Sequence, residues 1–209
     1  VGIDFTGAAS GLLDAELLEP SRSIVASEFA AQPLVRARLQ AALAAARHAL
    51  GRTEEAVELG LATRPLLLES VGPDDEELLL FDVSLASWLE RLGRLGEASD
   101  LREASLPRAE TAFGPTGRPT LELLLLGATL GIDGDEAALE ICLETDERLA
   151  SIDHDLDRPD EWNLAIRSAV SRSVILFELG RFEEALELRR RVATALEAMP
   201  STAEVVELM

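Results

Sequence analysis

The sequence of 209 residues contains no lysine, so all 19 of its basic side chains are arginines. The phosphate-binding lysine of P-loop enzymes, the ATP-binding lysine of protein kinases and a Schiff-base lysine are therefore excluded from this chain. Acidic residues number 39, which gives a net charge of −20. A chain this acidic is not expected to bind nucleic acid or an anionic membrane, because both require a basic face.

Cysteine, histidine and tyrosine are also scarce. Cys142 is the single cysteine, so no internal disulfide can form, and its apolar neighbours indicate a small buried side chain. His48 and His154 have no metal-binding or catalytic partner nearby in the sequence. Tyrosine is absent while leucine and alanine dominate, which favours helices over sheets. We therefore expect a chain that is not an enzyme and that holds no cofactor.

One acidic stretch resembles the start of a calcium-binding loop. Residues 153–157 read Asp-His-Asp-Leu-Asp, but Arg158 stands where that loop needs glycine and Leu164 where it needs a bidentate glutamate. The stretch is therefore interpreted as a solvated acidic loop, and no metal site is expected.

Long apolar runs are missing as well. No uncharged run approaches the ~20 residues that span a bilayer, and no secretory signal is visible. We expect no membrane insertion and a cytoplasmic location. The chain starts at Val1 without methionine, which suggests part of a longer protein.

What the sequence does have is a repeated phrase. Residues 50–59 read LGRTEEAVEL, residues 92–101 read LGRLGEASDL and residues 179–188 read LGRFEEALEL. In each copy a glycine that can adopt the left-handed conformation lies between apolar residues at helical spacing. The phrase therefore predicts the end of one helix, a tight turn and the start of a second helix.

The phrase recurs at a nearly constant distance. Its alanine occurs at Ala56, Ala98, Ala137 and Ala185, at spacings of 42, 39 and 48 residues. A period near 42 with two helices in each unit is typical of a solenoid. First helices are expected at residues 34–50, 75–92, 119–130 and 160–179, and second helices at 53–70, 95–113, 135–152 and 181–198.

Local signals refine these helices. Pro65 and Pro107 fall inside two second helices, where a kink or an early stop is expected. Thr53 is a candidate N-cap, and the acidic residues 74–76 suit a helix N-terminus. We divide the chain into a leading segment with leading helices (1–31), a repeat array (32–200) and the start of a capping helix or truncated repeat (201–209).

These helix pairs resemble tetratricopeptide repeats (TPRs) of the longer, kinesin-light-chain type. The resemblance implies an all-α fold, a right-handed α-solenoid of about four antiparallel helix pairs. Repeat 3 departs from the pattern, because its turn, residues 131–134, has one residue too many and Leu124 stands where a small residue is usual. The family's turn glycine matches Gly51, Gly93 and Gly180, and its small residue seven positions earlier matches Ala44, Ala86 and Ser173.

A second resemblance concerns the leading segment. Residues 13–17 (LDAEL) and 28–39 (EFAAQPLVRARL) are similar to the region that leads into such repeats behind bacterial serine/threonine kinase domains. No kinase motif is present in the chain. The resemblance implies only that the repeats belong to a larger bacterial signalling protein, and the alanine- and leucine-rich composition agrees with a bacterial origin.

In TPR arrays the first helices line a concave groove that holds a peptide or a helix. The expected groove is an apolar strip edged by arginines that meet partner carboxylates. The alternative is that several of its leucines and valines pack against neighbouring helices. Asn163, the single asparagine, falls outside the groove positions, so the family's amide clamp is not expected. The groove positions are Arg38, Leu80, Val83, Ser87, Arg91, Arg118, Leu121, Leu125, Arg167, Val170, Val174 and Phe177.

The predicted function is therefore a non-catalytic scaffold that binds a protein or peptide partner. One alternative is the sensory region of a serine/threonine kinase, which would act on its own catalytic domain or bind a small ligand. Another is self-association, since the end of a solenoid exposes apolar surface.

Overall fold

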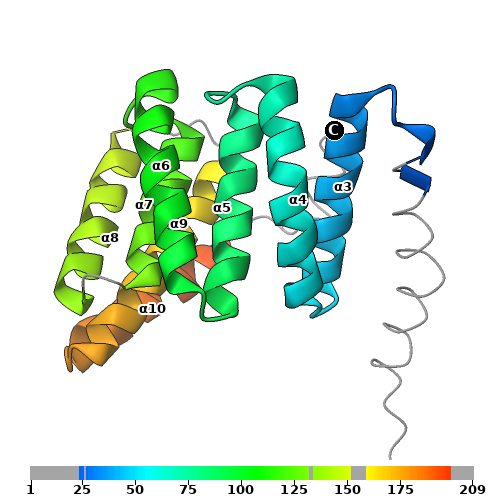
Figure 1. Ribbon diagram of the computed structural model, residues 1–209. Helices are drawn as coiled ribbons and strands as arrows, with labels where there is room; N and C mark the ends of the chain where they lie inside the picture. The colour runs from blue at the N-terminus through cyan, green and yellow to red at the C-terminus, as the bar shows by residue number, and fades with distance from the viewer. Residues whose placement is uncertain (1–23, 26, 132–133, 152–158, 199–209) are drawn as a thin grey trace, which may run out of the picture. The chain divides into compact units, whose positions relative to one another are not determined.

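The computed structural model describes residues 24–25, 27–131, 134–151 and 159–198 (Figure 1). The elements in these ranges are eight α-helices, with no strand among them. The chain divides into two compact units, Val1–Gly114 and Pro115–Met209. None of the helices in the described part is long and apolar enough to cross a membrane.

Unit 1 contains two helix pairs. Repeat 1 is α3 (Pro33–Ala49) with α4 (Thr53–Val71), and repeat 2 is α5 (Glu76–Arg91) with α6 (Leu95–Phe113). Each helix packs on the one before it, and the two first helices, α3 and α5, also touch (Figure 1).

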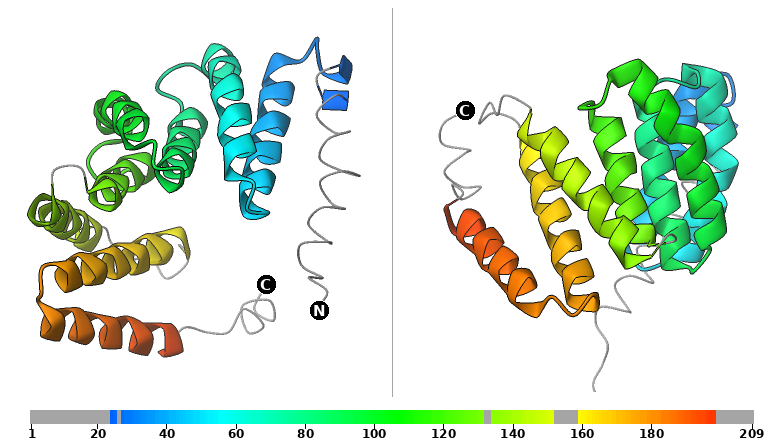
Figure 2. Two further views of the ribbon diagram at one scale, coloured as in Figure 1. Left: turned by 60° about the horizontal axis from the view of Figure 1, so that its bottom comes forward. Right: turned by 90° about the vertical axis from the view of Figure 1, so that its left-hand side faces the viewer.

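Unit 2 repeats this plan. Repeat 3 is α7 (Arg118–Leu130) with α8 (Asp135–Ala150), and repeat 4 is α9 (Pro159–Glu178) with α10 (Phe182–Ala198). The first helices α7 and α9 touch, and α9 packs against both α8 and α10 (Figure 2). The predicted bounds of all eight helices are confirmed to within two residues.

The turn between the helices of a pair depends on glycine. Gly51, Gly93 and Gly180 have φ values of 81°, 73° and 75°, the left-handed region that side chains disfavour. The arginine that follows each glycine donates its backbone N–H to the carbonyl five residues earlier, at 2.8–3.0 Å. This is the Schellman arrangement, which satisfies the last carbonyls of a helix. The repeated Leu-Gly-Arg is therefore a helix stop.

Repeat 3 corrects one predicted position. In the other repeats the N–H of the phrase's alanine donates to the carbonyl of the residue four before it, and that alanine is buried. In repeat 3 the alanine with these properties is Ala138, which bonds to the carbonyl of Gly134, whereas Ala137 is half-buried. The prediction of Ala137 was wrong by one residue, because the buried alanine lies seven residues after Gly131 but only five after the turn glycine of the other repeats.

Two local expectations also needed correction. α4 and α6 continue through Pro65 and Pro107, so neither proline stops its helix early, whereas the kink expected as the other outcome stays a prediction. Thr53 is the first residue of α4 rather than its N-cap, and its hydroxyl lies 3.3 Å from Nδ1 of His48. The expectation at the start of α5 is confirmed, because Asp75 caps it by accepting the N–H of Glu77 at 2.9 Å.

Several sequence predictions fall outside the described residues. They are the stretch 153–157, most of the leading segment and the C-terminal residues 199–209. The boundaries proposed for those segments stay predictions.

Small residues occupy the contact between the two helices of a pair in repeats 1, 2 and 4. Ala44, Ala86 and Ser173 on first helices and the phrase's alanines on second helices are buried, which lets the two backbones approach closely. Cys142 is buried among Leu139, Leu176 and other apolar side chains of unit 2, as its sequence context predicted. Burial raises the pKa of the Cys142 thiol to about 11, so it behaves as a small apolar side chain.

Candidate protein-interaction surface

The structure separates the predicted groove residues into buried and exposed sets. Val83, Leu121 and Leu125 have their side chains in the core. Their burial agrees with the alternative given for the groove, in which some of its leucines and valines pack against neighbouring helices. Leu80 and Ser87 are half-buried, and the Ser87 hydroxyl donates to the carbonyl of Val83 at 3.0 Å.

Two of the predicted arginines link neighbouring first helices. Arg38 of α3 donates through Nε and Nη2 to the carboxylate of Glu77 on α5 at 2.8–3.1 Å, and this hydrogen bond raises the Arg38 pKa above its usual value. Arg167 of α9 donates to Glu122 of α7 at 2.8 Å. Both arginines are about half exposed to water, which screens their charges, so these pairs contribute little to stability. The other two predicted arginines, Arg91 and Arg118, are exposed at the surface.

Three predicted residues form an exposed apolar row on α9, which we call the α9 strip. Val170 and Val174 are each 43% exposed and Phe177 is 57% exposed. Their spacing of four and three residues places them on one side of the helix. The ring of Phe177 meets the ring of Phe182, the first residue of α10, edge to face with centroids 5.0 Å apart.

The opposite side of α9 is the side that packs. Leu164, Ser168, Ile175 and Leu176 are buried there, and α8 and α10 are the helices that α9 packs against most extensively. At about 100° per residue the centre of this buried side lies roughly 180° from the α9 strip. The strip is therefore an apolar row on the exposed side of α9, whose opposite side already packs against α8 and α10.

Two further residues lie next to the strip, and sequence reasoning had placed one of them, Asn163, outside the groove. Asn163 lies four residues before Arg167 and seven before Val170, so it continues the same row, and it is exposed. The count from the turn glycine had stopped one helical turn too early. Glu178, eleven residues after Arg167, is exposed at the other end of the strip. Helical spacing alone could have found both.

The sequence matches no protein family model and no curated protein. Its structure is similar to the crystal structure of BtubC (BKLC) from P. vanneervenii, with a TM-score of 0.70 over 94% of this chain and 84% of that chain. The chain has a TPR-like fold. Sequence identity is 12%, so the likeness concerns the α-solenoid architecture alone.

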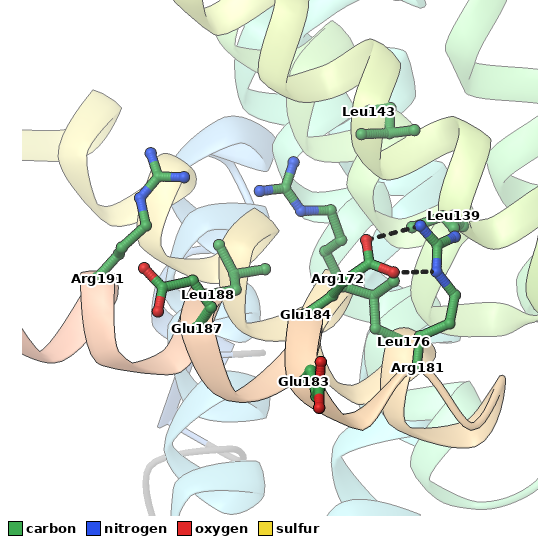
Figure 3. A pocket seen from close by; sticks show the side chains of 10 residues that line it. All are labelled: Leu139, Leu143, Arg172, Leu176, Arg181, Glu183, Glu184, Glu187, Leu188 and Arg191. Atoms are coloured by element: carbon green, nitrogen blue, oxygen red, sulfur yellow. Dashed lines mark hydrogen bonds and ion pairs between the residues drawn. The ribbon is translucent and has the colours of Figure 1, made fainter.

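Unit 2 also contains a surface hollow that the sequence did not predict. It has a volume of about 450 Å³, and it lies between the second helices α8 and α10 with α9 as its floor (Figure 3). Arg181 and Glu184 pair at 2.7 Å where α10 begins, and Glu183 lies beside them in the lining. Its other charged residues are Arg172, Glu187 and Arg191, so arginines and glutamates balance and neither sign of ion is favoured.

A second hollow, of about 530 Å³, lies in unit 1. It is lined by the start of α3, including Pro33 and Arg36, and by the end of α4, including Leu66 and Glu69. None of the twelve predicted groove residues lines either hollow. Within the described ranges no three histidine, cysteine or acidic residues are grouped as a metal site requires.

Proposed function

We propose that this chain is a non-catalytic protein-interaction module whose partner docks a peptide or a helix on the α9 strip. The TPR-like fold supports a scaffold role, because such helix pairs offer side chains on rigid elements. The observation that carries the proposal is the exposure of the strip, since the equivalent positions are all buried in repeat 3 and the one equivalent to Val170 is also buried in repeat 2.

The comparison of exposure rests on register within the repeats. Val170 and Val174 lie ten and six residues before the turn glycine, and the residues at these distances in repeat 3 are Leu121 and Leu125. Those leucines are 2% and 1% exposed, against 43% for each valine. In repeat 2 the residue ten before the glycine, Val83, is also buried.

The second helix of repeat 4 shows the same difference. Leu186 directly follows the buried Ala185 of the phrase and is 50% exposed. Its equivalents, Val57 in repeat 1 and Leu139 in repeat 3, are 0% and 6% exposed, and α4 and α8 each pack against the first helix that follows. Among the described helices none follows α10 in this position. Repeat 4 therefore presents apolar side chains that the other repeats cover.

Covering these side chains releases free energy. Complete burial of a valine, leucine or phenylalanine side chain contributes about 1.5–3 kcal/mol, so finishing the burial of a half-exposed one contributes roughly half of that. Aromatic residues are frequent anchors of protein interfaces, and Phe177 with Phe182 would be such an anchor. The partner we expect has apolar residues three or four apart on a helix, or alternating along an extended peptide.

The finer parts of the proposal come from the sequence resemblances. We propose that the module belongs to a larger bacterial signalling protein in the cytoplasm, on the similarity of residues 28–39 to kinase-linked repeat regions. In that setting a kinase domain of the same protein would be a candidate partner for the α9 strip.

The proposal is tested by selecting binders from a display library of random short peptides on the immobilised protein. Selected peptides should bind wild type and lose affinity about tenfold or more with Val174→Glu, because a charge would enter the apolar contact. Leu61→Glu, at an exposed leucine of α4, is the matched control and should bind normally. Selected peptides that bind all three proteins equally would remove the α9 strip from the proposal.

A further inference from the structure

The α9 strip carries charges of opposite sign at its two ends. Arg167 lies at its N-terminal end and Glu178 at its C-terminal end, and both are exposed. Their separation of eleven positions corresponds to about 16 Å at the 1.5 Å rise of a helix. At about 100° per residue the two side chains leave the helix within roughly 20° of each other. Charge and apolar surface thus alternate along one helix side as basic, apolar, acidic.

This order is complementary to itself when the helix is reversed. An antiparallel copy of α9, related by a twofold axis across the middle of the strip, brings Arg167 opposite Glu178 of the partner subunit. Glu178 then lies opposite Arg167 of the partner subunit. Val170 and Val174 occupy the levels between the two ion pairs, so the valines of the two copies face each other. A twofold interface of this kind uses the same patch on both subunits.

We infer that the α9 strip is an interface between two copies of this chain, packed as antiparallel α9 helices with two Arg167–Glu178 pairs. The inference rests on the proposed function, because it names the partner of the same surface. The ion pairs fix the register, since a shift of one helical turn separates each arginine from its glutamate by about 5 Å. The apolar residues between them, together with Phe177, supply the affinity.

The existing ion pair of Arg167 is compatible with this interface. Only Nη1 of Arg167 donates to Glu122, at 2.8 Å, and its side chain is 48% exposed. A guanidinium has five N–H donors arranged in a plane, so it can bridge two carboxylates. The pair with Glu122 therefore leaves donors of Arg167 for Glu178 of the partner subunit.

The net charge of −20 opposes association of two copies. This repulsion acts over long distances and is screened by salt, with a screening length of about 8 Å at 0.15 M. The dimer is therefore expected to be weak and to depend on protein concentration. Its detection requires concentrated protein at moderate salt.

The test uses two opposite charge reversals in the full chain, measured by sedimentation velocity over a range of concentrations at about 0.15 M salt. Arg167→Glu alone faces Glu178 of the partner subunit with like charge, and Glu178→Arg alone faces Arg167 of the partner subunit with like charge. Each variant alone should raise the dimer dissociation constant about tenfold or more. An equimolar mixture should restore association to near the wild-type level, because both ion pairs then form between unlike chains.

Controls separate this interface from changes inside one chain. Circular dichroism checks that each variant is folded, and loss of fold would not be restored by mixing. Glu122→Gln removes the intrachain pair of Arg167 and should leave the dimer unchanged. A wild-type chain that stays monomeric at all concentrations, or a mixture that associates no better than either variant alone, overturns the inference. A monomer whose strip still binds selected peptides would leave the proposed function standing.

Discussion

The junction between a second helix and the next first helix is built with opposite charges in the two units. In unit 1 the residue eight after the phrase's alanine is Arg64 of α4, which donates two hydrogen bonds of 2.7 and 2.9 Å to Asp82 of α5. In unit 2 the residue eight after the alanine is Asp146 of α8, which accepts from Arg172 and Ser168 of α9. The ion pair spans the same junction with its charges exchanged.

The two carboxylates differ in how much water reaches them. The Asp82 side chain is 0% exposed and accepts a third hydrogen bond from Ser105 of α6 at 2.7 Å, whereas the Asp146 side chain is 29% exposed. A buried carboxylate is tolerated only when its hydrogen bonds are complete. The comparison indicates that placing the acid on the first helix encloses it between two second helices, and that placing it on the second helix leaves it partly hydrated.

The apolar side chains at the same junction also differ in size between the two units. Gly60, four residues after the alanine, faces Leu85 and the ring of Trp88, so that a Cβ at Gly60 would lie 2.8 Å from Leu85 Cδ1. In unit 2 the equivalent residues are Cys142 and Ile175, both buried in one apolar cluster. Unit 1 combines the smallest residue with the largest, and unit 2 combines two of intermediate size. Total volume is conserved although the individual residues are not.

The largest expected effect tests whether the two units unfold independently. Ala185→Arg places a long charged side chain where α9 and α10 meet and should unfold repeat 4, at a cost of several kcal/mol. Hydrogen exchange should increase over α9 and α10 and stay unchanged over α3 to α6. Ala150→Arg, at an exposed alanine at the end of α8, is the control and should be neutral. Uniform loss of protection in both units would mean that the array unfolds as one cooperative body.

The next largest effect is the loss of stability when the arginine of each ion pair is replaced by alanine. Arg64→Ala leaves Asp82 fully buried with one remaining partner and should cost about 3 kcal/mol, the range for breaking a buried pair. Arg172→Ala leaves Asp146, which is already partly hydrated, and should cost about 1 kcal/mol. Urea unfolding of the two variants measures the difference.

A paired replacement sharpens this contrast between the two junctions. Asp82→Leu combined with Arg64→Met should recover part of the stability lost in Arg64→Ala, because an apolar pair needs no hydrogen bonds and only the buried Ser105 hydroxyl loses its acceptor. Equal costs for Arg64→Ala and Arg172→Ala would show that burial of the carboxylate does not set the free energy of the pair.

The sequence predicted the helices well because their ends have local causes. A glycine with positive φ and a following N–H that bonds backward fix the within-pair turns of repeats 1, 2 and 4, and both depend on neighbouring residues only. The one-residue error at Ala137 arose where the turn is longer than the repeat suggests. The exchanged ion pairs were not predicted, since Arg64 and Asp82 are eighteen residues apart and no local pattern joins them.

The candidate surface was only partly predictable for a different reason. Apolar residues occupy equivalent positions in repeats 3 and 4, namely Leu121 and Leu125, and Val170 and Val174. The sequence alone therefore predicts the same burial for all four. Whether such a residue lies in the core or at the surface depends on which helix packs over it, and that is a property of the assembled units. The positions of Asn163 and Glu178 beside the strip, in contrast, can be derived from helical spacing alone.

A smaller effect is expected from filling the space beside Trp88. Gly60→Ala gains roughly 1 kcal/mol of helix propensity, but its Cβ overlaps Leu85 and approaches Trp88 to 3.3 Å in a buried site, so we expect a net loss of about 1 kcal/mol. Gly96→Ala in α6 meets nothing within 4 Å and should be neutral or stabilising by a few tenths of a kcal/mol. Thermal unfolding distinguishes the two, and stabilisation of both would show that the α4–α5 junction has room to spare.

The smallest expected effect concerns pH and the corner where a pair turns. His48, three residues before Gly51, stacks on Trp88 with ring centroids 5.5 Å apart, and unit 2 has Phe177 at the equivalent position. Burial, with a smaller effect from the Arg91 charge, lowers the pKa of His48. The unfolded chain therefore binds the proton first, and the stability contributed by neutral His48 is present above about pH 6.5 and declines as the pH falls below it. His48→Phe removes this dependence. As the pH falls from 7 to 5, the unfolding free energy of wild type should therefore decrease relative to that of the variant. A difference that stays constant over this range would mean that His48 has the same pKa in the folded and unfolded chains.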